Sequence, residues 1–229
     1  MPLHWRMNDT MGQKGILRFR EELASLVLKM RSKGIDDVRF FSAIEKIPRQ
    51  QFVASSWLNS AYDNKVIPIE CGEYIERLEE QLLILSALSL KKKHRVLEIG
   101  TGSGFCTALM ACLSGRVTTV DRYKTLVDLA RQKFQILGLE NIVIRQLDGS
   151  CMITGFGSFD RILIWPSRSD EPKEFLDILT ENGILIQAIG PDEGVQTMTR
   201  YTKIGNRFEC LEMFQVRYQP FIKGVAEIL

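Results

Sequence analysis

A glycine-rich loop and a later aspartate are the residues whose types and spacing could hold a ligand. The loop lies in VLEIGTGSGF, residues 96–105, and places Gly100, Gly102 and Gly104 directly after a short apolar run. Glycines suit a strand-to-helix turn where a ligand must approach the backbone closely. Asp121 ends the next apolar run, where a carboxylate can accept hydrogen bonds from both hydroxyls of a ribose. This combination indicates a cofactor that contains a nucleoside.

The spacing of the glycines argues against a dinucleotide cofactor. The dinucleotide fingerprint is G-x-G-x-x-G, whereas this loop reads G-x-G-x-G, with Glu98 two residues before its first glycine. A carboxylate beside the loop suits a ligand with a cationic end better than it suits a pyrophosphate. The alternative explanation is that the glycines only form an ordinary tight turn.

The elements that must position this loop are predicted by the pattern of apolar residues. From residue 94, short apolar runs alternate with helical segments, which indicates an α/β fold with a mostly parallel sheet. The expected parallel strands are residues 95–99, 116–120, 142–147, 161–165 and 184–189. Helices are expected at 104–113, 123–137 and 172–180, and antiparallel edge strands at 195–203 and 208–221.

The residues before the sheet predict an N-terminal helical extension. Apolar residues at helical spacing predict helices over residues 16–33 and 36–47. Residues 48–72 show no sustained period and form a long connection, a kind of segment that is often functional. We expect residues 1–90 to form this extension and residues 91–229 to form the ligand-binding core as one compact unit.

Composition limits the classes of function. The net charge of the 229 residues is +2, and the one tight basic run lies at residues 91–95, so no nucleic-acid-binding face is expected. The longest apolar block, residues 81–90, is about half of the ~20 residues that a membrane helix needs. The first 15 residues contain no apolar core of a secretory signal. We expect a cytoplasmic protein without membrane association.

Cysteine and histidine usage argues against a metal site. The sequence contains five widely spaced cysteines without a C-x-x-C pair, namely Cys71, Cys106, Cys112, Cys151 and Cys210. This pattern indicates neither a disulfide framework nor a zinc site. The two histidines, His4 and His94, have no plausible ligand partner nearby in the sequence. We therefore expect no metal ion.

The order of these elements, the glycine loop, Asp121 and the LDG at 147–149 together resemble the class I methyltransferases that use S-adenosylmethionine. The resemblance implies a Rossmann-like sheet in which the loop wraps the amino acid part of the cofactor, Asp121 holds the ribose and Asp148 reaches the adenine amino group. The cofactor-binding residues implied in this way are Glu98, Gly100, Thr101, Gly102, Ser103, Gly104, Asp121, Arg122, Asp148 and Gly149.

Segments outside the loop are similar to the protein-L-isoaspartate O-methyltransferase family. They are IPRQQFV at 47–53, AYDNKVIPIECGEYIE at 61–76 and QVRYQPFIKG at 215–224. The resemblance extends over nearly all the chain from about residue 20, and it implies methylation of the free carboxylate of isomerised aspartyl residues in protein repair. Such a carboxylate is already ionised at neutral pH, so the reaction needs orientation and desolvation and does not need a histidine base.

One segment departs from the family pattern. Where the family typically reads G-Q-T-I-S-x-P, this chain reads G-E-Y-I-E-R-L, and Glu76 replaces a serine that donates its hydroxyl near the substrate carboxylate. The resemblance places the substrate at Glu73, Tyr74 and Ile75, which with Glu76 we call the lip, residues 73–76. The lip belongs to the N-terminal part of the chain.

Several alternatives remain open for these residues. Glu76 is either a catalytic group, for example a base for an amine, phenol or hydroxyl substrate in a diverged methyltransferase, or a helix-start residue. A non-catalytic cofactor-binding module is a third possibility. Trp165 narrows the substrate entrance, stacks on adenine or packs in the core, and Pro220 approaches the substrate or lies in an edge strand. Glu79 and Glu80 are expected on the solvated face of a helix that starts near Glu76.

Overall fold

The computed structural model describes residues 13–150 and 157–226. His4 and Cys151 lie outside the described residues. Cys71, Cys106, Cys112 and Cys210 are free thiols. Over the described ranges, no helix is long and apolar enough to cross a membrane.

A seven-stranded sheet forms the centre of the fold, in the order β5-β4-β3-β6-β7-β8-β9. Strands β3 to β7 run parallel, and β8 and β9 add antiparallel pairs at one edge. The mostly parallel sheet with antiparallel C-terminal strands is therefore confirmed. The strands are β3 (Arg95–Ile99), β4 (Arg116–Asp121), β5 (Ile142–Gln146), β6 (Phe159–Arg168), β7 (Leu179–Ile189), β8 (Gln196–Ile204) and β9 (Arg207–Val216).

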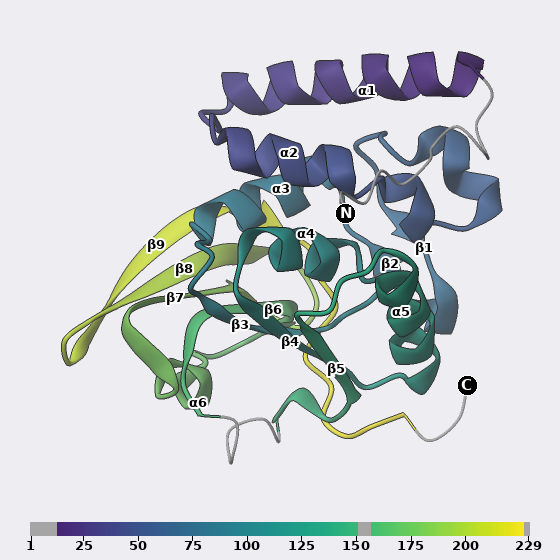
Figure 1. Cartoon of the computed structure of the whole chain (residues 1–229). Helices are drawn as coiled ribbons and strands as arrows, with labels where there is room; N and C mark the ends of the chain where they lie inside the picture. Colours follow the sequence, from purple (N-terminus) through teal and green to yellow (C-terminus); the bar gives the residue numbers. More distant parts are fainter. Residues whose placement is uncertain (1–12, 151–156, 227–229) are drawn as a thin grey trace.

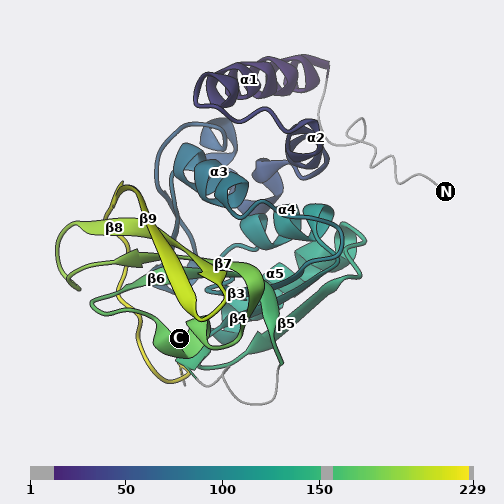
Figure 2. The same ribbon diagram turned by 90° about the vertical axis from the view of Figure 1, so that its left-hand side faces the viewer.

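Helices cover both faces of this sheet. Figure 1 shows α1, α2 and α3 stacked above the sheet and α6 below it, and the turned view in Figure 2 shows the same three helices on one side. The helices are α1 (Gln13–Ser32), α2 (Val38–Lys46), α3 (Leu78–Ala87), α4 (Phe105–Leu113), α5 (Lys124–Ile136) and α6 (Lys173–Leu176). Helices α4 and α5 connect consecutive parallel strands, as the alternating pattern predicts.

Several element boundaries differ from the prediction, most of all near residues 172–180 and at the last strand. The helix expected over residues 172–180 is a single turn, because β7 already begins at Leu179, which pairs with Phe159 of β6. Both side chains are buried, so sheet pairing takes residues that the apolar pattern assigns to a helix. The last strand is also shorter than residues 208–221, since β9 ends at Val216.

The long connection is ordered by short elements. It contains three 3-10 helices, η2 (Arg49–Phe52), η3 (Ser55–Ser60) and η4 (Glu70–Gly72), and a short strand, β1 (Ile67–Pro68), paired antiparallel with β2 (Tyr74–Ile75). This pairing fixes the backbone of the lip.

Arg49 ties this connection to the lip. Its side chain is fully buried, and its guanidinium donates to the Ala61 carbonyl at 2.9 Å, the Glu76 carbonyl at 2.8 Å and Gln81 Oε1 at 3.2 Å. Burial lowers the pKa of Arg49 to about 10, so it stays charged at neutral pH. Because hydrogen bonds from a charged donor are stronger than neutral ones, this contact holds three distant segments together.

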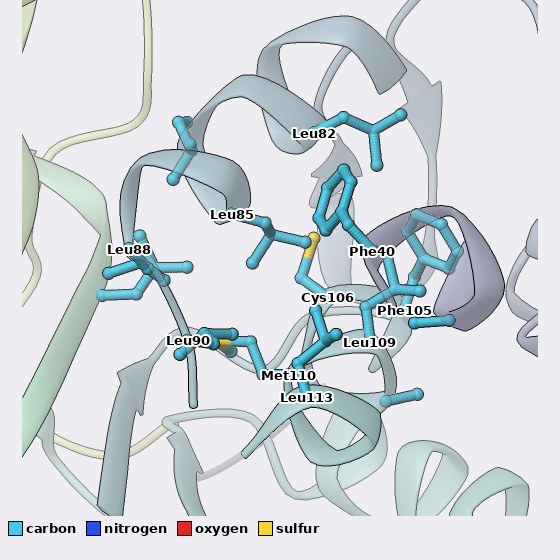
Figure 3. Packing of buried hydrophobic residues seen from close by; sticks show 14 of the residues in the cluster. Phe40, Leu82, Leu85, Leu88, Leu90, Phe105, Cys106, Leu109, Met110 and Leu113 are labelled. Atoms are coloured by element: carbon cyan, nitrogen blue, oxygen red, sulfur yellow. The ribbon is translucent and has the colours of Figure 1, made fainter. Parts of the chain in front are cut away.

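The largest part of the core lies between the sheet and helices α2, α3 and α4. Figure 3 shows Phe40 of α2 and Leu85 of α3 directed toward α4, where Cys106 and Leu109 lie. All four side chains are buried, and the same cluster includes Val96 of β3. The helices before the sheet and the sheet itself therefore share one packed interior.

We expect Leu109→Ala to lower the free energy of unfolding by about 2–5 kcal/mol, since it removes a fully buried side chain and leaves a cavity. Leu28→Ala on α1, where the side chain is 67% exposed, is the matched control and should change stability by less than about 0.5 kcal/mol. Urea unfolding of both variants measures the difference. Equal effects would contradict the described packing of α4.

Candidate active site

A cavity of about 400 Å³ opens at the carboxyl ends of β3 and β4. The chain leaves β3 toward β4 on one side, whereas β6 pairs with β3 on the other, so the cavity lies where the strand order reverses. Ligands of open α/β sheets bind at such a point. The glycine loop, the lip and residues 218–222 of the C-terminal segment enclose the cavity.

The glycine loop has a backbone that other residues adopt only with strain. Gly100, Gly102 and Gly104 have φ of 93°, 53° and 87°. A Cβ at Gly104 would lie 2.9 Å from the ring of Phe134, so the loop packs too closely on α5 for any side chain there. Gly102 faces more open space, where the nearest atom to a Cβ would be Ile69 Cδ1 at 3.7 Å. The loop thus presents bare backbone to the cavity.

Asp121 at the end of β4 holds the backbone of the glycine loop in place. Its carboxylate accepts the N–H of Gly102 at 2.9 Å and the N–H of Tyr123 at 3.0 Å. Burial raises the pKa of Asp121, while these backbone donors oppose the shift. Asp121 and the adjacent Arg122 both line the cavity, as do Thr101 and Ser103 of the loop.

Glu98 lies behind the loop and is fully buried. Its carboxylate accepts hydrogen bonds from Thr107 Oγ1 at 2.5 Å, Thr119 Oγ1 at 2.7 Å and Trp165 Nε1 at 3.0 Å. Burial raises the pKa of Glu98 to about 7 despite these three donors. The structure therefore encloses Glu98 in protein and uses it to hold Trp165, whose Cβ lies 3.2 Å from the position of a Cβ on Gly100.

The residues after β5 contact the C-terminal segment. Gly149 lines the cavity and packs so closely that a Cβ would lie 2.5 Å from Ile99 Cγ2. Asp148 accepts the N–H of Ser150 at 2.9 Å and of Gly224 at 2.7 Å. Burial acts to raise the pKa of Asp148, but these N–H donors hold it below its ordinary value.

Pro220 lies on the cavity wall beyond the end of β9, where it forms an isolated parallel bridge with Ser167 of β6. The segment is held by Ser167 of β6, whose N–H donates to the Gln219 carbonyl and whose carbonyl accepts the Phe221 N–H, both at 2.8 Å. Trp165 also lines the cavity, with its ring 6.2 Å from that of Tyr218. These residues form the wall opposite the lip.

Glu73 joins the lip to that opposite wall. The Gln219 side-chain amide lies against the Glu73 carboxylate and donates to it when its nitrogen faces the carboxylate, and the Tyr123 hydroxyl donates to the same group. Burial and the nearby Asp121 raise the pKa of Glu73. Tyr74 and Ile75 line the cavity beside it, and Ile75 is buried.

Glu76 follows β2 and lines the same cavity. Its backbone carbonyl is held by Arg49. Burial raises the pKa of the Glu76 carboxyl to about 8, with Glu80 and Glu73 acting in the same direction and Arg77 opposing them. The structure thus brings all four lip residues to the cavity.

Glu79 and Glu80 do not lie on a solvated face, and that expectation is wrong. The helix begins at Leu78, and Glu79 is only 7% exposed, with its carboxylate paired to Lys29 of α1 and to Lys33, which follows the end of α1. Glu80 is largely covered and pairs with Arg77 at 3.1 Å. Helix α1 and the turn after it, distant in sequence, supply the cations that allow Glu79 to be buried.

Several residues of the cavity wall are not among those predicted from the sequence, namely Tyr123, Tyr218, Gln219 and Cys106. Two of them had a signal, since Tyr218 and Gln219 fall inside the family-like segment 215–224. Tyr123 lies two residues beyond Asp121, but nothing in its spacing distinguishes it from a helix-start residue. Cys106 occupies an apolar stretch in which only the fold reveals the contact.

Glu98 should make stability depend on pH. Because its pKa is raised to about 7, the folded protein retains a proton that the unfolded chain loses above about pH 4.5. The contribution is full below pH 4.5 and is lost as pH rises through about 7, on the order of 3 kcal/mol. We expect the urea-unfolding free energy of Glu98→Gln to fall less than that of the native chain over this window. Parallel profiles would contradict the burial of this carboxyl.

Known proteins share both the sequence and the fold. The family model described as Protein-L-isoaspartate(D-aspartate) O-methyltransferase (PCMT) matches residues 21–226. A protein-L-isoaspartate O-methyltransferase of Bradyrhizobium sp. (strain ORS 278) is 40% identical over 202 residues, which are 88% of this chain and 94% of that relative. One from Rhizobium meliloti (strain 1021) is 38% identical over 204 residues, 89% of this chain and 100% of that relative.

A solved structure agrees with these relatives. A protein-L-isoaspartate O-methyltransferase from Plasmodium falciparum, in complex with S-adenosyl-L-homocysteine, superposes with a TM-score of 0.77 at 25% identity and covers 90% of this chain and 99% of its own. The predicted class I methyltransferase fold is confirmed. The chain belongs to the protein-L-isoaspartate(D-aspartate) O-methyltransferase family.

Proposed function

We propose that this chain methylates the free carboxylate of isoaspartyl residues in proteins and peptides, with S-adenosylmethionine as methyl donor. The observation that carries the proposal is the cavity at the carboxyl ends of β3 and β4, in a chain that the family model matches over residues 21–226. Repair of cytoplasmic proteins is the setting that we propose for this reaction.

The residues of the cavity fit the cofactor. Bare backbone at Gly100 and Gly102 allows the amino acid part to approach the loop closely, and a Cβ at Gly100 would meet Trp165. Asp121 uses one lone pair of each oxygen for a backbone N–H and retains others for ribose hydroxyls. We assign Gly149 and the remaining acceptor capacity of Asp148 to the adenine, and Thr101, Ser103 and Arg122 to the surrounding wall, while Gly104 lets the loop pack on α5.

We propose a division of labour along the chain. Residues 91–229 provide the cofactor wall, and residues 1–90 provide the lip and the helices that support it. Glu98 acts in this scheme as a positioning residue, because its buried carboxylate holds Trp165 against the loop. Trp165 and Pro220 complete the substrate side of the cavity, opposite Tyr74 and Ile75.

The proposed reaction asks the chain to orient and desolvate two groups. When bound, the cofactor supplies a methyl group on a sulfonium centre. A substrate carboxylate is ionised at neutral pH, so no residue has to remove a proton before attack. The apolar walls from Ile75, Trp165 and Pro220 exclude water from the carboxylate, which favours a step in which opposite charges are lost.

The test uses radiolabelled methyl donor and two peptides that differ only in aspartate versus isoaspartate. We expect base-labile label on the isoaspartyl peptide and none on its partner. Absence of label on both peptides, together with measurable cofactor binding, would overturn the proposal and support a non-catalytic module. Label on an amine, phenol or hydroxyl substrate, stable to base, would indicate the diverged methyltransferase instead.

Asp121 gives a second test, which concerns the cofactor alone. Loss of a charged acceptor for ribose hydroxyls in Asp121→Asn should weaken S-adenosylhomocysteine binding about 10- to 100-fold by calorimetry. Asp36→Asn is the control, since Asp36 lies between α1 and α2 with its side chain 80% exposed. Unchanged affinity in Asp121→Asn would contradict the assignment of this residue.

A further inference from the structure

Glu76 occupies a fixed position on the substrate side of the cavity. Arg49 holds its backbone carbonyl at 2.8 Å, and β2 immediately precedes it. Glu76 lines the cavity together with Tyr218 of the opposite wall and Cys106 of α4, and its carboxyl lies close enough to both to raise their pKa values. A fixed backbone therefore holds this carboxyl beside two other groups of the cavity wall.

The charges around Glu76 are predominantly negative. Glu80 at the start of α3 and Glu73 before β2 both disfavour a second negative charge. Arg77 is the cation that opposes them, but it is half-exposed and paired with Glu80 at 3.1 Å. The guanidinium of Arg49 points its donors at two carbonyls and Gln81.

The two other ionisable groups beside Glu76, the Tyr218 hydroxyl and the Cys106 thiol, are uncharged. Burial raises the pKa of Tyr218 well above its ordinary value, and its hydroxyl lies 3.5 Å from Glu80 Oε2. Burial likewise raises the pKa of the Cys106 thiol well above its ordinary value. Both groups stay protonated near neutral pH, so no thiolate or phenolate competes with Glu76 for a proton.

An ionised Glu76 would conflict with an anionic substrate. Two carboxylates about 4 Å apart repel strongly in a partly buried site, because the effective dielectric there is far below that of water. A protonated carboxyl in the same place would instead donate a charge-assisted hydrogen bond, the strong class of such bonds. The proposed substrate is therefore compatible with Glu76 only when Glu76 is protonated.

We propose that Glu76 acts as a neutral acid that donates its proton in a hydrogen bond to the substrate carboxylate, and thereby selects and orients it. This inference rests on the proposed function, because it concerns how the isoaspartyl carboxylate is held. No proton is transferred in the step: the O–H bond of Glu76 stays intact, and the substrate carboxylate attacks with its other oxygen.

The electrostatics of the folded chain support this protonation state. The pKa of Glu76 is raised to about 8, so the carboxyl is largely protonated at neutral pH. A bound carboxylate adds one more negative charge and raises the pKa further. A carboxylic acid kept neutral by its surroundings so that it can donate a hydrogen bond is an established enzymatic device.

The test is the pH dependence of kcat/KM for the isoaspartyl peptide between pH 6 and 10. The native chain should lose about tenfold per pH unit above about pH 8, as Glu76 ionises in the free enzyme. Glu76→Gln and Glu76→Ser keep a donor that does not titrate, so this descending limb should disappear in both. Glu76→Ala lacks a donor and should lose about 10- to 100-fold at pH 7.

Glu45→Gln is the matched control, because Glu45 is exposed on α2 and does not line the cavity. Its profile should keep the limb of the native chain. A second readout is the binding of the isoaspartyl peptide to the protein saturated with S-adenosylhomocysteine, which should weaken over the same pH range only where Glu76 is present.

The outcomes separate this inference from the proposed function. Isoaspartyl methylation with the same limb in the native chain and in Glu76→Gln would overturn the role of Glu76 and leave the function standing. A rate that rises through pH 8 and is lost in Glu76→Gln would show a base, and would also overturn the inference. No label on the isoaspartyl peptide in any variant would overturn the proposed function itself.

Discussion

The architecture of the site depends on the hydrogen bonds that one fully buried carboxyl group accepts. Glu98 of β3 accepts from Thr107 of α4, Thr119 of β4 and Trp165 of β6, so one side chain joins four elements. A buried carboxyl group is tolerated only when its oxygens are hydrogen-bonded, and these donors are available only if β4 and β6 flank β3 in the observed register. The strand order and the glycine loop are thus mutually dependent.

Burial also affects the other acidic groups of the cavity. Glu73, Glu76, Glu98 and Asp121 all have raised pKa values, in each case chiefly because burial disfavours the ionised form. Two nearby cations are already engaged by other groups. Arg77 pairs with Glu80, and Arg49 donates hydrogen bonds to backbone carbonyls. A cavity lined by these acidic groups therefore favours the cationic part of a ligand. It accommodates an anionic part only beside an acidic group that keeps its proton.

Local signals in the sequence were sufficient for the fold. Short apolar runs predicted every parallel strand, and the glycines predicted the loop, because both features depend on residues close together in the chain. The burial of Glu79 was not predictable in this way, since it depends on Lys29 of another helix and on Lys33 just after that helix. The start of β7 at Leu179 was missed for a similar reason: pairing with Phe159 decides it, and the apolar pattern of those residues fits a helix equally well.

The candidate site divides along the same line. The loop and Asp121 form a spacing that can be read from one segment, whereas Tyr218 and Gln219 reach the cavity because Ser167 of β6 holds the C-terminal segment. Sequence also located Glu76 but left its protonation open, since a pKa depends on what surrounds the group in space. A serine donates a hydrogen bond at every pH between about 6 and 10, whereas a glutamic acid does so only while it is protonated. In our proposal, burial of the lip by Arg49, α3 and the C-terminal wall is therefore what keeps the glutamate at this position protonated, so that it can face an anionic substrate.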